Sequence, residues 1–146
     1  MMKFCFITPD DVEYPHELML RWEVLLKPLG LPPGNELIDE EKGSLHLVAV
    51  EKKKLVGCVL FFPEGESSGK LHEMALSEEH QGRGFGRKLI STLEQALIKK
   101  GFTEIYLFAP QDKVGFYERM GYKSESELKK EKGVLLQRMN KRLQPA

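Results

Sequence analysis

The sequence lacks net charge, long hydrophobic runs and a leader-like start, and each absence excludes a class of protein. Its 22 lysines and arginines balance 22 aspartates and glutamates over 146 residues. A protein that coats nucleic acid carries a strong basic excess, so we expect no nucleic-acid partner. No run approaches the roughly 18 apolar residues of a membrane span, and the N-terminal apolar stretch is too short for a signal peptide. We therefore expect a cytoplasmic protein without a membrane partner.

Cysteine is nearly absent as well. Cys5 and Cys58 lie in separate apolar, strand-like segments, and no Cys-x-x-Cys motif occurs. A disulfide framework and a cysteine zinc site are therefore unsupported, and we predict two buried thiols. The histidines are dispersed without the spacing of a metal motif, so we predict no metal.

Enough apolar material is present for one core. With 41% hydrophobic residues, the chain fits a single domain over residues 1–146. Helical spacing of apolar residues predicts helices over 18–29, 84–100 and 114–120, and alternating or β-branched runs predict strands over 3–7, 45–50, 55–62, 70–76, 103–109 and 133–139. An early hairpin and a late β-α-β unit indicate an α/β protein of the α+β type. We expect a mixed, mostly antiparallel sheet flanked by helices, with one parallel crossover.

The zero charge conceals an asymmetry along the chain. Residues 1–41 hold nine acidic and three basic side chains, a balance of −6, so residues 42–146 carry +6. The two portions are either ordinary solvated surfaces or the complements of two differently charged ligands.

A glycine-rich turn between the strand at 70–76 and the following helix is the most informative segment. It reads Gln81-Gly82-Arg83-Gly84-Phe85-Gly86. The first N–H groups of a helix lack partners and the helix dipole is positive there, so this turn favours a phosphate ligand. The spacing fits neither a P-loop nor the dinucleotide motif G-x-G-x-x-G. A tight turn that merely needs small residues is the alternative.

The turn resembles the acetyl-CoA signature Q/R-x-x-G-x-G/A of the GCN-five-related N-acetyltransferase (GNAT) superfamily. A second block, Val114–Tyr122, is similar to the later family motif in which Phe-Tyr precedes glycine and an aromatic residue. The segments 21–25, 32–34 and 46–49 look similar to a branch of small bacterial ElaA-like or YjcF-like proteins. The resemblance implies the GNAT acyl-CoA N-acyltransferase fold, with acetyl-CoA as co-substrate.

The resemblance also implies where the cofactor lies. In the family, the strand before the glycine turn bulges and diverges from the next strand, and its free backbone groups hold the pantetheine arm and the thioester carbonyl. The glycine turn holds the pyrophosphate, with two arginines adding charge. The implied cofactor-binding residues are Met74, Ala75, Leu76, Gln81, Gly82, Arg83, Gly84, Phe85, Gly86, Arg87, Asp112 and Phe116. Asp112 stands near the position of a family asparagine, and an ionised aspartate cannot donate a hydrogen bond.

Transfer of an acyl group from a thioester to an amine needs a base, a polarised carbonyl and an acid for the thiolate. Tyr117 matches the usual general acid of the family, and a core aromatic is the alternative. His72 is the stronger candidate for the base because its reference pKa of about 6.5 suits proton removal near neutrality. Glu73 faces the other side of the strand and needs a local twist to reach the same site.

The family builds its acceptor site from the first helices, the next loop and the last strands, which points here to Arg21, Trp22, Glu23 and Glu36. The resemblance therefore implies direct transfer of an acetyl group to a primary amine, on a small molecule or a peptide, within a ternary complex. A non-catalytic acyl-CoA-binding module is the alternative, and a homodimer is left open. The acidic first portion would favour a cationic amine.

Overall fold

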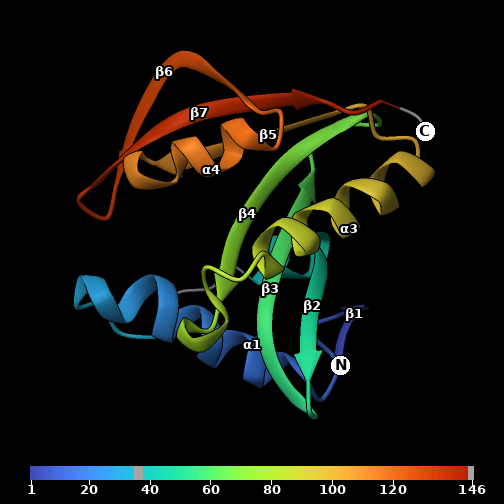
Figure 1. Ribbon diagram of the computed structural model, residues 1–146, viewed down its shortest axis with the longest axis vertical. Helices are drawn as coiled ribbons and strands as arrows, with labels where there is room; N and C mark the ends of the chain where they lie inside the picture. The colour runs from blue at the N-terminus through green and yellow to red at the C-terminus, as the bar shows by residue number, and fades with distance from the viewer. Residues whose placement is uncertain (35–37, 145–146) are drawn as a thin grey trace.

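The computed structural model describes residues 1–34 and 38–144, which form a seven-stranded sheet with helices on both faces (Figure 1). No helix in this part of the chain is long and apolar enough to cross a membrane. The strands are β1 (Met2–Ile7), β2 (Leu45–Glu51), β3 (Lys54–Pro63), β4 (Ser68–Leu76), β5 (Glu104–Pro110), β6 (Lys123–Glu131) and β7 (Val134–Arg142). The α-helices are α1 (Tyr14–Arg21), α2 (Ile38–Gly43), α3 (Phe85–Lys99) and α4 (Val114–Arg119).

The strand order is β1-β2-β3-β4-β5-β7-β6. β4 and β5 pair in parallel, and the five other strand pairs of the described chain are antiparallel. The parallel pair is connected through α3, as a parallel pair requires a crossover. This topology confirms the mixed, mostly antiparallel sheet with one crossover that the sequence predicts.

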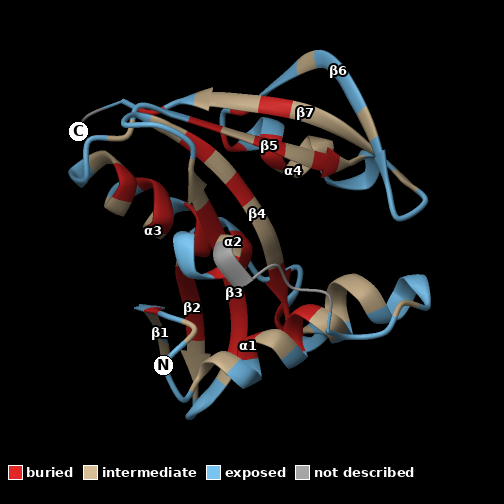
Figure 2. Cartoon of the chain, turned by 180° about the vertical axis from the view of Figure 1, so that it is seen from behind, coloured by how far each residue is buried: buried red, intermediate tan, exposed pale blue. Residues whose placement is uncertain are grey.

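Each face of the sheet carries its own apolar cluster. Leu89 and Leu93 of α3 pack with Phe61 and Leu71 on one face, and Leu107 of β5 belongs to the same cluster. Leu20 of α1 packs on the opposite face, against strand residues that include Val48, Cys58 and Ala75. We call these the α3 face and the α1 face. Figure 2 shows the buried segments of the central strands between the two layers of helices.

The first helix is longer than α1 alone because it changes type. After Arg21 the chain continues as a π-helix, Trp22–Leu26, and then as a 3-10 turn, Lys27–Leu29, which ends at Gly30 with φ 72°. Pro28 has no N–H to donate to a preceding carbonyl, so α-helical hydrogen bonding cannot continue through this last turn. The predicted helix and its glycine end are therefore confirmed, with an irregular second half.

The structure corrects the sequence analysis at three places. β6 was not predicted, because its residues are mostly charged and an edge strand shows no apolar alternation. The short helix α2, in an acidic segment of the chain, was not predicted either. Cys58 is buried as predicted, but Cys5 is exposed because β1 is the other edge strand and gives it few neighbours.

Candidate active site

The strands β4 and β5 separate after three paired positions. Ser68, Gly69 and Lys70 pair with Glu104, Ile105 and Tyr106, and pairing stops there. The rest of both strands diverges, and Figure 1 shows β4 curving away from β5. Backbone groups along the two facing edges are thus free of ladder hydrogen bonds with each other. This opening in the middle of the sheet is the divergence that the family resemblance implies.

A bulge distorts β4 beside the opening. Leu60 of β3 pairs with His72, whereas Cys58 pairs with Ala75, so β4 has one extra residue between the two pairs. Glu73 lies in the bulge with φ 51°, a left-handed conformation that costs energy for a residue with a side chain. The Cys58 thiol donates a hydrogen bond to the Glu73 carbonyl oxygen over 3.3 Å. The bulge is the local twist that Glu73 was predicted to need.

The glycine turn joins this strand to α3. Gly82 and Gly84 have φ of 73° and 83°, so both positions need glycine for backbone conformation. Gly84 is the N-cap of α3, and no side chain caps this helix end. The first N–H groups of α3 are therefore available to an external acceptor.

Three of the predicted cofactor-binding residues converge where α3 begins. A β-carbon added to Gly86 would lie 3.0 Å from the Met74 Cε atom and 3.5 Å from the Phe116 Cζ atom. Residue 86 must therefore stay small for the bulged strand, α3 and α4 to meet at this point. The sequence separates these three residues, and the fold joins them.

The polar residues of the turn mostly bind the backbone around it. The Gln81 side-chain amide donates to the Leu76 carbonyl over 2.8 Å, which ties the turn to the end of β4. Arg87 donates to the Arg119 carbonyl at the end of α4 over 3.3 Å. Arg83 donates to the Glu79 carbonyl over 3.3 Å and stacks 5.0 Å from the Phe85 ring centroid. Both guanidinium groups lie beside the uncapped helix end.

The remaining predicted cofactor residues differ in exposure. Ala75 and Leu76 are buried, and the Ala75 side chain packs toward α1, so only its backbone can face the opening. Asp112 is exposed in the short 3-10 turn before α4. Its role as a cofactor contact stays a prediction.

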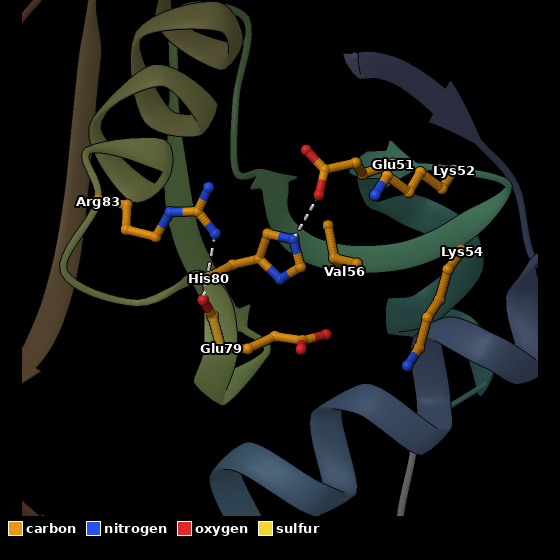
Figure 3. Close-up of a pocket in the computed structure, with 7 residues that line it drawn as sticks. All are labelled: Glu51, Lys52, Lys54, Val56, Glu79, His80 and Arg83. Carbon is orange, nitrogen blue, oxygen red and sulfur yellow. Dashed lines mark hydrogen bonds and ion pairs between the residues drawn. The ribbon is translucent and has the colours of Figure 1, made fainter.

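A pocket of about 260 Å³ beside the turn was missed by the sequence analysis (Figure 3). His80 is buried here, and its Nε2 atom donates to a Glu51 carboxylate oxygen over 2.9 Å. Its Nδ1 atom lies 2.6 Å from the Ser77 hydroxyl. Through these two contacts, His80 links the segment before the glycine turn to the β2–β3 hairpin. The only sequence signal is a histidine next to the glycine motif. The lining residues are Glu51, Lys52, Lys54, Val56, Glu79, His80 and Arg83.

Arg21, a predicted acceptor-binding residue, is instead buried in an ion-pair network under the opening. Its guanidinium donates to Glu17 over 2.9 Å and to both carboxylate oxygens of Glu41 over 2.8 and 2.9 Å. Tyr14 donates to Glu41 over 2.7 Å. Burial opposes the charge on Glu41, but these hydrogen bonds outweigh it and lower the Glu41 pKa.

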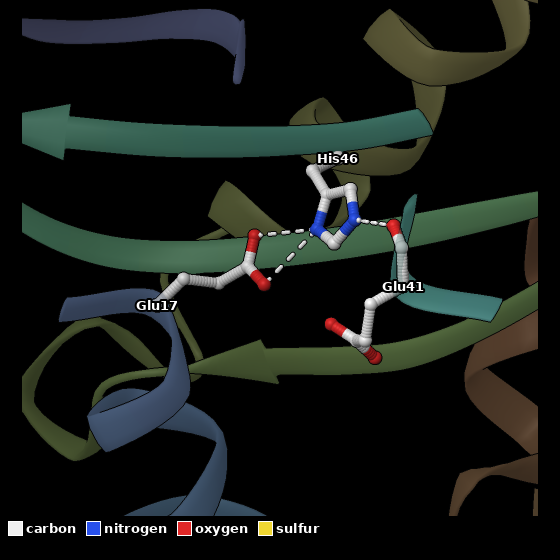
Figure 4. Close-up of side chains that lie close together, drawn as sticks. All are labelled: Glu17, Glu41 and His46. Carbon is white, nitrogen blue, oxygen red and sulfur yellow. Dashed lines mark hydrogen bonds and ion pairs between the residues drawn. The ribbon is translucent and has the colours of Figure 1, made fainter. Parts of the chain in front are cut away.

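His46 completes this network from β2 (Figure 4). Its Nδ1 atom donates to Glu17 over 3.0 Å, and its Nε2 atom donates to the Glu41 carbonyl over 2.7 Å. Burial lowers the His46 pKa, but these two acceptors outweigh it and raise the pKa overall. Glu17, Glu41 and His46 place ligand atoms within 4.8 Å of one another, as a metal site would. Arg21 and the hydrogen bonds already engage those atoms, so the cluster is an ion-pair network.

The other predicted acceptor residues follow α1. Trp22 is half-buried and donates its indole N–H to the Leu31 carbonyl over 2.9 Å, whereas Glu23 is exposed. Glu36 lies outside the described residues. Neither tryptophan nor glutamate is engaged in the network around Arg21.

His72 and Glu73 differ sharply as bases. His72 lies on the α1 face, where its Nε2 atom is 3.2 Å from the Ser44 hydroxyl. Burial, with the charges of Lys70 and Arg21, lowers the His72 pKa to about 4. Burial raises the Glu73 pKa instead, against the lowering effect of Arg21, whose Nη2 atom lies 3.6 Å from a Glu73 oxygen. The preference for His72 over Glu73 is therefore not supported by the electrostatics.

Tyr117 lies on α4 and is 6% exposed. Its ring packs edge-on against Phe116 at 5.1 Å and Tyr122 at 5.6 Å between centroids. Burial raises the Tyr117 pKa, so the phenol is neutral and keeps its proton at neutral pH. Burial therefore also widens the gap between the Tyr117 pKa and the pKa of an ordinary thiol.

The chain matches known proteins along most of its length. Residues 33–143 match the model of the acetyltransferase (GNAT) domain. An acetyltransferase of Yersinia pestis is 30% identical over 136 residues, which cover 87% of this chain and 92% of the relative. ElaA of Escherichia coli has a TM-score of 0.82 at 19% identity, over 97% of this chain and 99% of its own. An aminoglycoside 6'-N-acetyltransferase solved with coenzyme A has a TM-score of 0.78 at 19% identity, over 99% and 98% of the chains. At these identities the two structures show the fold.

Proposed function

Because this chain belongs to the acetyltransferase (GNAT) family, we propose that it transfers the acetyl group of acetyl-CoA directly to a primary amine. The observation that carries the proposal is the opening between β4 and β5 beside the uncapped end of α3. A strand edge with free backbone groups suits the pantetheine arm and the thioester. A helix N-terminus with two neighbouring arginines suits the pyrophosphate. The aminoglycoside acetyltransferase of the same fold was solved with coenzyme A, which supports acetyl-CoA as the co-substrate.

Binding of the cofactor uses the residues around the glycine turn. The pyrophosphate accepts hydrogen bonds from the first N–H groups of α3, where Gly82 and Gly84 leave room for close approach. Arg83 and Arg87 add positive charge at the same end. Met74 and Phe116, which meet over Gly86, contact the pantetheine arm. Acetyl-CoA supplies the activated thioester, and free backbone N–H groups at the bulge polarise its carbonyl.

We assign proton removal from the acceptor ammonium to Glu73. Its carboxylate is 34% exposed at the bulge, and its raised pKa makes it a stronger base than an ordinary glutamate. His72, with a pKa of about 4, is a much weaker base. Through its contact with Ser44 it shapes the side of the opening on the α1 face, which we call the acceptor side because Glu73 lies there. The neutral amine nitrogen then attacks the thioester carbon, and the carbon–sulfur bond breaks in collapse of the tetrahedral intermediate.

We assign protonation of the leaving thiolate to Tyr117. Its proton is retained at neutral pH because burial raises its pKa. A thiolate expelled next to this buried side chain would be destabilised by the same loss of solvation, which favours proton transfer to sulfur. The resulting phenolate takes up the second proton released from the new amide nitrogen, so the step balances.

The experiment that tests this function is acetyl-CoA consumption by the purified protein against a panel of primary amines, with product mass identified. The proposal expects equimolar free thiol and N-acetylated amine. A direct transfer in a ternary complex expects intersecting initial-rate lines when both substrates are varied, and no acetylated protein. A non-catalytic module of the same fold would bind acetyl-CoA by calorimetry without consuming it.

A further inference from the structure

The α1 face of the sheet changes character beyond β4. Over β2 to β4 it is covered by α1, whereas α4 packs against Leu107 and Met139 on the opposite face. Lys70 and His72 lie on the α1 face of β4, and Tyr106, which pairs with Lys70, begins the same face of β5. Phe108 follows on that face, just past the point at which the strands separate. The acceptor side of the opening is therefore bordered by His72 on β4 and Phe108 on β5.

Three cations from three different strands surround the ring of Phe108. The Lys129 ammonium of β6 lies 4.9 Å from the ring centroid, the Lys70 ammonium 5.6 Å, and the Arg138 guanidinium of β7 5.8 Å. Arg138 also stacks 3.9 Å from the Tyr106 ring centroid. This cation–aromatic patch, formed by Lys70, Tyr106, Phe108, Lys129 and Arg138, faces the acceptor side.

The cations of this patch are not equally available to a ligand. Arg138 is paired with Glu125 at 2.8 Å, and Lys129 is paired with Glu131 at 3.0 Å. Lys70 takes part in none of the ion pairs found among the residues that the structure describes. Its ammonium lies at the opening because it contacts Phe108, and its charge lowers the pKa of both His72 and Glu131. Lys70 is thus a half-buried cation that lies against an aromatic ring and has no ion-pair partner among the described residues.

Among the acidic groups of the first portion of the chain, Glu40 lies on the acceptor side, with a carboxylate oxygen 3.9 Å from the His72 Nδ1 atom. Glu17 and Glu41 are paired with Arg21 and His46 in the buried network. On the acceptor side, Glu73 remains at the bulge, and Lys132 at the tip of the β6–β7 hairpin is close enough to lower its pKa. Glu131 of the same hairpin is paired with Lys129. The opening therefore presents the Glu73 carboxylate to an ammonium and, apart from it, the Lys70 ammonium, which forms no ion pair among the described residues.

We propose that the acceptor is an amine that also carries an anionic group, such as a carboxylate. The anionic group pairs with Lys70, the hydrocarbon part of the acceptor lies on Phe108, and the ammonium faces Glu73. This substrate class rests on the proposed acetyl transfer. It replaces the cationic amine that the acidic first portion of the sequence favours.

Matched triads of acceptors test the charge requirement. In one triad, 5-aminopentanoate, 5-aminopentanamide and 1,5-diaminopentane share chain length and nearly equal amine basicity, and they differ only in the distal group. Triads with shorter and with aromatic spacers vary the reach. We expect kcat/KM to be highest for the anionic member of the best triad, by about tenfold or more over the neutral one, as for a charge-assisted hydrogen bond.

Variants assign the preference to Lys70. Lys70→Met should remove the tenfold preference, so that the anionic and the neutral acceptors have similar kcat/KM values, and Lys70→Glu should favour the diamine. Lys99→Met, on the exposed end of α3, is the matched control and should keep the wild-type order.

The outcomes separate the two proposals. If a neutral or cationic acceptor is best, or if Lys70→Met keeps the anionic preference, acetyl transfer stands and the anionic class is wrong. If the protein binds acetyl-CoA but acetylates no amine, the proposed function itself is wrong and this inference falls with it.

Discussion

The guanidinium of Arg21 lies 3.6 Å from the carboxylate of Glu73, which joins the buried ion-pair network to the bulge of β4. The Arg21 guanidinium also donates hydrogen bonds to Glu17 and to both carboxylate oxygens of Glu41, so its position is fixed. Its charge lowers the Glu73 pKa, and burial raises it more. The network thus sets both where the carboxylate lies and how basic it is.

Replacing the carboxylate should remove the base. We expect Glu73→Gln to lower kcat by about 10² to 10⁴, the effect of losing one general base, with acetyl-CoA affinity nearly unchanged. In the wild type the rate should fall as the pH drops through the Glu73 pKa, which lies above the ordinary glutamate value. Rate–pH profiles measure both effects. His72→Gln is the control, and an equal loss of kcat in that variant would contradict our assignment.

Changing Arg21 should move this pH profile without removing it. A lysine places one point charge where the guanidinium makes three hydrogen bonds and faces Glu73, so it cannot serve all three carboxylates. In Arg21→Lys we expect a higher Glu73 pKa and an acidic limb that shifts to higher pH. If kcat at saturating substrate falls but the acidic limb of the rate–pH profile stays at the wild-type pH, Arg21 acts only through the stability of the fold.

The ion-pair network should also dominate local stability. Glu17 is fully buried between Arg21 and His46, and removing one partner of a buried charge pair costs about 3 to 5 kcal/mol. We therefore expect Glu17→Gln to lower the free energy of unfolding by about that amount in urea titrations. Glu23→Gln, on an exposed residue of the same helical segment, should change it little.

The His46 part of this stabilisation depends on pH with a definite sign. The folded-state pKa of His46 is raised, so its contribution is complete below the unfolded-state pKa of about 6.5 and is lost as pH rises through the folded value. The difference in unfolding free energy between wild type and Glu17→Gln should therefore shrink toward alkaline pH. A difference that grows between neutral and alkaline pH would contradict a charged His46.

The sequence predicts the sheet and the position of the glycine turn before α3 well, for identifiable reasons. Local signals suffice where glycine conformation decides, as at Gly82 and Gly84, and where apolar spacing marks strands and α3. The family resemblance adds the bulge and the divergence of β4 from β5, which no local pattern encodes. Membership of the GNAT family, the fold class and the crossover are confirmed.

The acceptor side could not be predicted because long-range contacts decide it. Arg21 resembles a surface arginine in the sequence, and only the fold brings Glu41 and Glu73 to it. Because β6 is mostly charged, its sequence does not indicate a strand. The contact between Lys129 of β6 and Phe108 could therefore not be predicted. His72 looked the better base on its reference pKa alone, since burial beneath α2 cannot be read from the chain.

Removing one oxygen atom tests the general acid. We expect Tyr117→Phe to leave acetyl-CoA affinity nearly intact and to slow transfer by about 10² to 10⁴. The loss should be small for thioesters with more acidic leaving thiols, which need no proton. Tyr122→Phe is the matched control, because its hydroxyl donates to Glu94 in the core over 2.8 Å. Unchanged turnover in Tyr117→Phe would leave Tyr117 as a core aromatic only.

Two glycines with the same strain and different neighbours test the phosphate site. Gly84 and Gly101 lie at opposite ends of α3 with φ of 83° and 93°, and a β-carbon at either would meet no atom within 4 Å. Alanine at either position should therefore cost a similar amount of stability, about 1 to 2 kcal/mol, from the left-handed backbone alone. Only at Gly84 would the methyl group and the altered turn face the pyrophosphate. We expect calorimetry to show acetyl-CoA binding weakened at least tenfold in Gly84→Ala and unchanged in Gly101→Ala, and equal affinities in the two folded variants would place the cofactor elsewhere.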